Sequence, residues 1–353
     1  MKPAPAVLAG AVALTALALL PNESRAQYVP PAGYTKTPLL TAANQPLNAA
    51  GIGVSGGGRL AIADGSTITL YNTWQNGRTV IGSITDSADW SFLTDITFIG
   101  ENKIIVGENG KSKTAWSIDF TTPATPVAAK IAPSNSFPAI QDLALLNFTT
   151  ALVSGSTASQ GASGGLYLDK LNLTNGNISP VVSNAGSGFV GATGVTPAGS
   201  GVLLDTGVTT GIAHIYDSTN GTFVRDVSFA GGGGTGAYGL AFDPAGDAFV
   251  TTGATLTEIT GIDSANPAVT TFGSFSEGAA GFPFPTGIAF TGDSFRPDDS
   301  AQTGVLLVNG DFTNDGTVFA ITSVPEPASA GFLLLAGVAL VGQRRAKRGG
   351  DDV

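Results

Sequence analysis

The sequence predicts an all-β fold, a six-bladed β-propeller, on three observations. A pattern of short apolar strands separated by turns recurs along the chain at nearly regular intervals. No stretch between residues 50 and 324 has the periodicity of an amphipathic helix. Glycine, which supplies the positive φ angles of tight turns, accounts for 49 of the 353 residues, while only 12% of residues are charged.

The second strand of the repeated unit is the easiest to align. It reads RLAIAD from Arg59, KIIVGE from Lys103, TALVSG from Thr150, GVLLDT from Gly201, DAFVTT from Asp247 and GVLLVN from Gly304. The successive intervals are 44, 47, 51, 46 and 57 residues, and we interpret the polar segment 295–303 in the widest interval as a loop insertion. Four-stranded units of this length are typical of propeller blades, because each unit has an apolar face that only its neighbours can bury. A β-sandwich or a β-helix is the alternative interpretation.

The fourth strand of the unit predicts how the ring closes. Five units contain one, at residues 79–85, 127–131, 178–183, 222–229 and 269–275. The sixth unit does not, because its third strand, residues 318–322, runs almost directly into Pro325. An open ring would leave two unpaired strand edges. We therefore expect an N-terminal strand, residues 37–41, to pair with residues 318–322 and close the ring.

One segment resembles a known blade motif. GLAFDPAGDAFVTT, from Gly239 to Thr252, resembles the blades of NHL-like and SMP-30-like propellers. The resemblance implies the same fold, which we assign to a single domain over residues 27–324.

The N-terminus has the organisation of a secretory signal. Lys2 gives a basic start, and an almost wholly apolar run follows from Ala6 to Leu20. Ser24 and Ala26 are small residues at the −3 and −1 positions of a cleavage site before Gln27. We predict a signal peptide over residues 1–26, with an uncleaved membrane anchor as the alternative.

The C-terminus carries three features in a fixed order. The motif Pro325-Glu326-Pro327 precedes an apolar segment, 328–342, which we predict to be a transmembrane helix. A basic cluster follows at 344–348, formed by Arg344, Arg345, Lys347 and Arg348.

Together these features resemble the PEP-CTERM sorting signal of Gram-negative bacteria, over residues 325–348. The resemblance implies recognition in the membrane by an exosortase, processing of the tail near the Pro-Glu-Pro, and a place at the cell surface or in the exopolysaccharide matrix of a biofilm. An ordinary tail anchor is the alternative.

Composition excludes several kinds of chemistry. The chain has no cysteine and one histidine, His214, so thiol catalysis and sites with two imidazoles from one chain are excluded. The formal charge of −10 becomes about −13 when the two terminal segments, with six basic and three acidic residues, are removed. So acidic a domain is a poor binder of nucleic acid, whose phosphates require clustered basic side chains.

Two groups of acidic residues are candidate sites. Asp311, Asn314 and Asp315 lie in a turn rich in oxygen ligands, and Asp298 and Asp299 in the loop insertion could add ligands, which makes calcium a possible cofactor. An Asx turn explains the same residues without a metal. Several aspartates beside blade strands could form a carboxylate pair suited to sugar chemistry: Asp64, Asp95, Asp142, Asp205 and Asp243.

Two functions are consistent with these features. The first is a non-catalytic propeller that binds polysaccharide or protein outside the cell. The second is a propeller hydrolase or lyase that acts on extracellular polysaccharide through carboxylates. We favour the first, and a cluster of charged side chains at the central channel is the feature that would separate the two.

Overall fold

The structure, a computed structural model, consists of strands and turns. It describes residues 28–40, 49–75, 77–156, 165–185, 190–205, 211–229, 237–252, 255–275, 287–291, 305–309 and 318–323. None of these residues belongs to a helix, so no helix that could cross a membrane occurs among them. The predicted signal peptide and sorting signal lie outside the described residues.

The described strands form six antiparallel sheets. Sheet 1 contains β3 (Ala49–Val54), β4 (Leu60–Asp64), β5 (Thr67–Tyr71) and β6 (Val80–Thr85). Sheet 2 contains β7 (Leu93–Phe98), β8 (Lys103–Glu108), β9 (Thr114–Asp119) and β10 (Val127–Lys130). Sheet 3 contains β11 (Asp142–Asn147), β12 (Thr150–Ser156), β13 (Leu166–Asn172) and β14 (Ile178–Ala185).

The second half of the chain continues the pattern. Sheet 4 contains β15 (Val190–Val195), β16 (Gly201–Asp205), β17 (Gly211–Tyr216) and β18 (Phe223–Phe229). Sheet 5 contains β19 (Ala237–Phe242), β20 (Ala248–Thr252), β21 (Thr255–Thr260), β22 (Ala268–Phe275) and β1 (Tyr28–Val29). Sheet 6 contains β23 (Ile288–Thr291), β24 (Val305–Asn309), β25 (Val318–Ser323) and β2 (Tyr34–Leu40).

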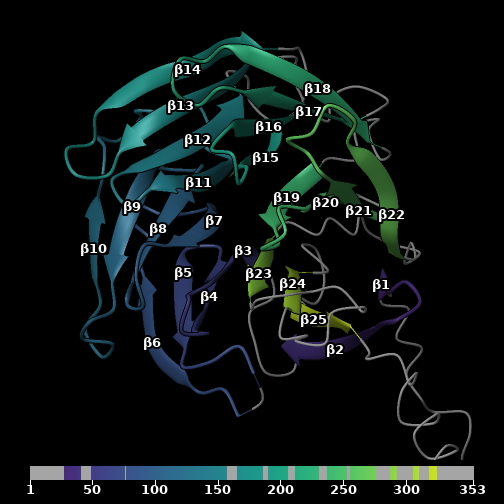
Figure 1. Cartoon of the computed structure of the whole chain (residues 1–353). Helices are drawn as coiled ribbons and strands as arrows, with labels where there is room; N and C mark the ends of the chain where they lie inside the picture. The colour runs from purple at the N-terminus through teal and green to yellow at the C-terminus, as the bar shows by residue number, and fades with distance from the viewer. Residues whose placement is uncertain are drawn as a thin grey trace, which may run out of the picture.

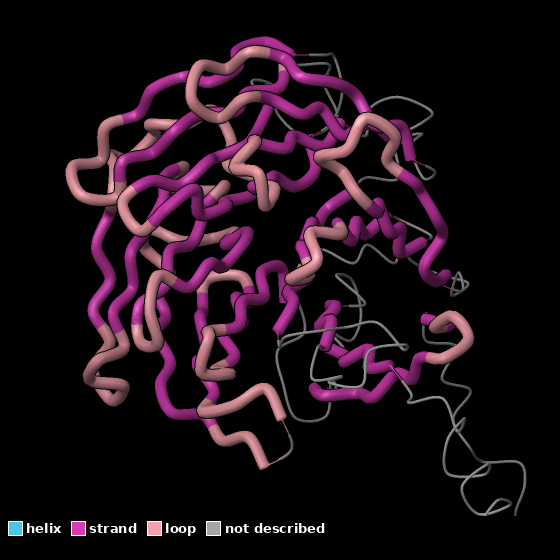
Figure 2. Tube along the Cα trace, in the orientation of Figure 1, coloured by secondary structure: helices cyan, strands magenta, loops and turns pink. Residues whose placement is uncertain are grey.

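The sheets surround a common axis as the blades of a β-propeller (Figures 1 and 2). The first strand of each sheet lies nearest the axis, and consecutive inner strands contact one another around the whole circle, including β23 against β3. The predicted propeller fold is therefore confirmed. The predicted fourth strands are also present, and their observed bounds differ from the predicted bounds by at most two residues.

Five sheets contain four consecutive strands of the chain, whereas sheet 6 is composite. Its outer strand is β2, which pairs antiparallel with β25 from Tyr34 opposite Ser323 to Leu40 opposite Val318. The N-terminal strand expected to close the ring is thus confirmed, and it begins three residues earlier than predicted. A register shift between Pro38 and Leu40 accompanies the burial of both Leu39 and Leu40.

The segment before β2 adds a contact that the sequence did not predict. β1 pairs with the outer strand of sheet 5, Tyr28 opposite Phe275 and Val29 opposite Ser274. The N-terminal segment therefore crosses from the outer edge of sheet 5 to the outer edge of sheet 6 (Figure 1).

The core lies between neighbouring sheets. Close packing of the inner strands explains why some of their residues are glycine. The largest buried cluster among the described residues joins sheets 1 and 2 and includes Trp90 and Trp116, whose rings meet edge to face with centroids 5.5 Å apart. A Cβ on Gly51 would lie 2.0 Å from the carbonyl oxygen of Thr94, and a Cβ on Gly239 would lie 2.6 Å from the Ile288 side chain. Glycine at these positions lets the inner strands approach closely around the axis.

Candidate functional site

A cavity of about 290 Å³ lies on the axis of the propeller, between the six inner strands. Every sheet contributes lining residues, through β3, β7, β11, β15, β19 and β23. We call this space the channel cavity. Its position follows directly from the fold, because the ring of sheets leaves only the innermost side chains facing the axis.

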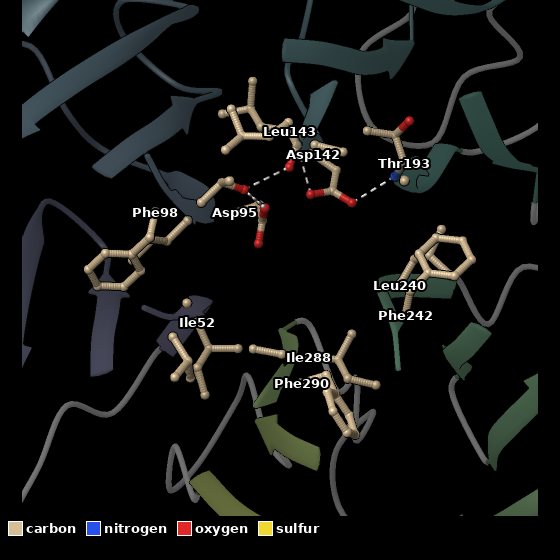
Figure 3. A pocket seen from close by; sticks show the side chains of 18 of the residues that line it. Ile52, Asp95, Phe98, Asp142, Leu143, Thr193, Leu240, Phe242, Ile288 and Phe290 are labelled. Atoms are coloured by element: carbon tan, nitrogen blue, oxygen red, sulfur yellow. Dashed lines mark hydrogen bonds between the residues drawn. The ribbon is translucent and has the colours of Figure 1, made fainter. Parts of the chain in front are cut away.

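Two carboxyl groups form one wall of the channel cavity. Asp95 lies near the start of β7 and Asp142 at the start of β11, so the two belong to neighbouring sheets. Their side chains lie close enough to interact, so that each one changes the pKa of the other. Asp142 is 5% exposed, whereas Asp95 keeps part of its surface open. We call these two residues the carboxyl pair (Figure 3).

Backbone amides and one hydroxyl hold the carboxyl pair in place. The backbone N–H groups of Leu143 and Thr193 donate to the two oxygens of Asp142, at 2.8 and 2.7 Å. Thr97 Oγ1 lies 3.4 Å from Asp95 Oδ2 and 3.1 Å from the carbonyl oxygen of Leu143, and can donate to either. The pair and its donors therefore link the inner strands of sheets 2, 3 and 4.

Burial determines the protonation of the carboxyl pair. Loss of solvent raises the pKa of Asp95 to about 6, although hydrogen bonds from Asp142, Ile96 and Thr97 oppose the rise. Loss of solvent, and then the charge of Asp95, raise the pKa of Asp142 well above its usual range. Two buried carboxyl groups that interact in this way favour a state in which they share a proton, because two negative charges close together repel strongly.

The opposite walls of the cavity are apolar. Ile52 and Ile288 lie across the cavity from the carboxyl pair, and the rings of Phe98, Phe242 and Phe290 lie around it (Figure 3). No lysine, arginine or histidine occurs among the described lining residues. The cavity therefore combines one hydrogen-bonding wall with an aromatic and aliphatic surface.

The repeat explains why these two aspartates meet. Asp95 and Asp142 each lie eight residues before the aligned second strand of their unit, which begins at Lys103 and Thr150 respectively. Equivalent positions in adjacent blades lie side by side, and Thr193 holds the same position in the next unit, before Gly201. The sequence analysis named both aspartates but did not pair them, although this common offset was the signal for the pair.

The other aspartates proposed for a carboxylate pair lie elsewhere. Asp64, Asp205 and Asp243 do not line the channel cavity. Asp205 lies instead beside His214 in sheet 4, with His214 Nε2 3.7 Å from Asp205 Oδ2 and His214 Nδ1 2.6 Å from Asp226 Oδ1. The nearby carboxylate of Asp205 is the main cause that raises the pKa of His214; burial opposes this rise, and Asp226 adds to it. His214 is thus held between two carboxylates, outside the channel.

The predicted calcium and sorting residues cannot be placed in the same way. All five calcium candidates, together with the signal-cleavage and sorting residues, lie outside the described residues. Within the described ranges, no three His, Cys, Asp or Glu side chains come together as a metal site.

Comparison with known proteins identifies the fold. No family model and no curated protein matches the sequence. The chain is similar in structure to a gluconolactonase from Xanthomonas campestris, with a TM-score of 0.59, 10% identity and coverage of 85% of this chain and 94% of that one. It is also similar to a calcium-binding protein, regucalcin, from Agrobacterium tumefaciens, with a TM-score of 0.55, 15% identity and coverage of 80% and 93%.

A third neighbour has a different named activity. Virginiamycin B lyase from Staphylococcus aureus matches with a TM-score of 0.54, 10% identity and coverage of 82% of this chain and 100% of that one. Likenesses at this level of identity show the fold alone, and they agree with the propeller motif that residues 239–252 resemble.

Proposed function

We propose that this protein is an exported, non-catalytic β-propeller that binds saccharide, as part of an extracellular polysaccharide, in its channel cavity. One observation carries the proposal: the cavity places a carboxyl pair opposite aromatic and aliphatic side chains. A sugar ring has hydrogen-bonding hydroxyls at its edge and apolar C–H groups on its faces. A volume of about 290 Å³ is at the lower end of the range for small-molecule sites, which suits one or two sugar units at the end of a chain.

The location of the protein follows from its terminal segments. A signal peptide over residues 1–26 would export the chain, and the PEP-CTERM-like signal over residues 325–348 would hold it in the inner membrane until an exosortase processes the tail. The processed protein would then remain at the cell surface or in the matrix, where polysaccharide or a matrix protein is its partner. We count the composite sheet 6 as the sixth blade of the ring.

A hydrolase or lyase is the second candidate, because the channel cavity contains two carboxyl groups with raised pKa values. Their geometry argues against the usual glycosidase mechanisms. Those mechanisms need carboxyl groups about 5 to 9.5 Å apart, with the sugar or a water between them. Asp95 and Asp142 instead interact directly with each other, and each oxygen of Asp142 accepts a hydrogen bond from a backbone amide.

Calcium at Asp298, Asp299, Asp311, Asn314 and Asp315 remains a prediction of the sequence. The calcium-binding neighbour supports it only at the level of the fold.

A glycan array with parallel measurement of turnover tests the proposed function. Ala144 lines the channel cavity and is partly exposed, so Ala144→Phe should fill the cavity and weaken saccharide binding at least tenfold. Ala129→Phe on the outer strand β10, where Ala129 is exposed, adds the same side chain outside the channel and is the matched control.

Two results would contradict the proposal. Equal binding by the wild type and Ala144→Phe would place the saccharide outside the channel. Turnover of a bound glycan by the wild type, lost in Ala144→Phe and kept in Ala129→Phe, would favour the enzyme.

A further inference from the structure

We propose that the group bound against Asp95 and Asp142 is an ammonium, so that the channel selects an amine-bearing saccharide over a neutral one. This inference deepens the saccharide binding proposed above and rests on it. It follows from the composition of the cavity walls, which combine two acidic groups with apolar surface.

The carboxyl pair has no cationic side chain among the described lining residues of the cavity. Elsewhere in the described structure, carboxylates do meet basic side chains: Asp89 lies 3.0 Å from Lys130 Nζ, and Asp226 lies 2.6 Å from the imidazole Nδ1 of His214. Buried carboxylates are normally paired with a cation, because loss of solvent makes an isolated charge costly. In the channel the shared proton takes that role, and a bound ammonium could replace it.

The pair also has acceptor capacity left for a donor from the cavity. An ionised carboxylate can accept about four hydrogen bonds. The backbone amides of Leu143 and Thr193 each take one site on Asp142, and part of the Asp95 surface remains open. An ammonium carries three N–H donors and no acceptor, so it complements two carboxylates better than a hydroxyl does.

The apolar walls accommodate the rest of such a molecule. Phe98 lies three residues after Asp95 on β7, which is about 10 Å of strand. Phe242 and Phe290 line the cavity from β19 and β23, and their rings lie at its edge (Figure 3). An amine at the carboxyl pair would therefore leave a sugar ring beside aromatic side chains, against which its C–H face can pack.

Exchange of the shared proton for an ammonium predicts that protons are released when the ligand binds. In the free protein the pair holds a proton, as the raised pKa values of both groups indicate. An ammonium favours the ionised form of both carboxyl groups, so the proton passes to the buffer while the ligand keeps its own three N–H groups. Binding should then release up to about one proton for each amine bound.

Isothermal titration calorimetry at pH 7 tests the inference with three probes: the β-1,4-linked disaccharide of glucosamine, its N-acetylated form, and the corresponding glucose disaccharide. The glucosamine disaccharide should bind at least tenfold more tightly than either neutral disaccharide. Its binding heat should change between phosphate and Tris buffers, because these buffers take up the released proton with different enthalpies.

Two variants separate the carboxyl pair from the general acidity of the protein. Asp95→Asn should reduce the preference for the amine to less than threefold. Asp89→Asn removes one negative charge from the outer surface and should retain the preference. If Asp95→Asn keeps the preference, or if no proton is released, the amine binds elsewhere and the inference is wrong.

The controls also separate this inference from the proposed function. Equal affinity for all three disaccharides, lost in Ala144→Phe, would overturn the ammonium site and leave saccharide binding in the channel intact. Absence of binding by all three, together with no Ala144-dependent binding on the glycan array, would overturn both.

Discussion

Asp95 and Asp142 reduce the unfavourable free energy of burying a negative charge by sharing a proton. A third buried carboxylate, Glu108, reduces it differently, since its two oxygens accept hydrogen bonds from the backbone N–H groups of residues 91, 92, 110, 111, 112 and 113. Burial acts to raise the pKa of Glu108, but these donors together lower it below its usual value. The carboxyl pair has fewer donors, and its pKa values rise instead. The pair therefore shares a proton where Glu108 remains ionised.

The raised pKa values predict that the carboxyl pair destabilises the fold as pH rises. In the unfolded chain both groups titrate near pH 4, and in the folded protein Asp95 titrates near pH 6. Folding thus favours the protonated form, so the stabilising contribution is complete below about pH 4 and decreases as pH rises through 6. Asp95→Asn keeps an N–H donor toward Asp142 without a titrating proton. Relative to this variant, the wild type should lose on the order of 3 kcal/mol of unfolding free energy between pH 4 and pH 8.

Urea unfolding at several pH values measures this difference. Asp89→Asn serves as the control, because it removes a carboxylate from an exposed ion pair with Lys130 and should follow the pH profile of the wild type. Parallel profiles for the wild type and Asp95→Asn would show that the pair does not share a proton.

Most strands were predictable from the sequence because they are short, largely apolar and bounded by turn residues. β10 was expected at residues 127–131 and is observed at Val127–Lys130. The closing strand could be predicted from a strand count, since the unit that ends at residue 323 lacks a fourth strand. β1 could not be predicted, because a two-residue pairing with β22 leaves no periodicity in the sequence. The carboxyl pair was missed for a related reason: contacts between blades are visible only when equivalent positions in different units are compared.

Removal of the closing strand should destabilise the ring. β2 contributes its ladder with β25, the buried side chains of Leu39 and Leu40, and a hydroxyl contact of 2.9 Å between Thr35 and Thr322. Deletion of residues 27–42 should lower the unfolding free energy by several kcal/mol, since a strand and two buried leucines are lost. Leu40→Ala is a milder change and should cost about 2–4 kcal/mol, because it leaves a cavity at a position that is 4% exposed.

Thermal and urea unfolding check this prediction, and deletion of residues 27–29 is the matched control. That shorter deletion removes only β1, whose two paired residues should contribute less than about 1 kcal/mol. Unchanged stability after deletion of residues 27–42 would mean that β2 does not close the ring in solution.

On the scale of the whole molecule, both ends of the ring lie on one sheet. β2 lies beside β25 (Figure 1), and Tyr34, the first residue of β2, is opposite Ser323, the last residue of β25. The predicted sorting motif begins two residues after Ser323, and the two prolines at 325 and 327 can extend neither a strand nor a helix. We therefore expect the folded propeller to end before the motif, so that processing of the tail would remove no residue from the sheet.

This arrangement predicts that sorting and folding are independent. Replacement of Pro325, Glu326 and Pro327 by alanine should leave an unprocessed, membrane-retained protein in a Gram-negative host that has an exosortase, because the enzyme would lose the motif next to the predicted helix at 328–342. The melting temperature of the purified propeller should stay within about 2 °C of the wild type, since no paired strand residue has changed. Intact mass and membrane fractionation measure processing.

Deletion of the basic residues 344–348 gives a second test, because these residues would hold the end of the tail in the cytoplasm. Equal loss of the tail in the alanine variant and the wild type would show that Pro325-Glu326-Pro327 is not a sorting motif. Retention accompanied by a large drop in melting temperature would instead place the motif inside the folded domain.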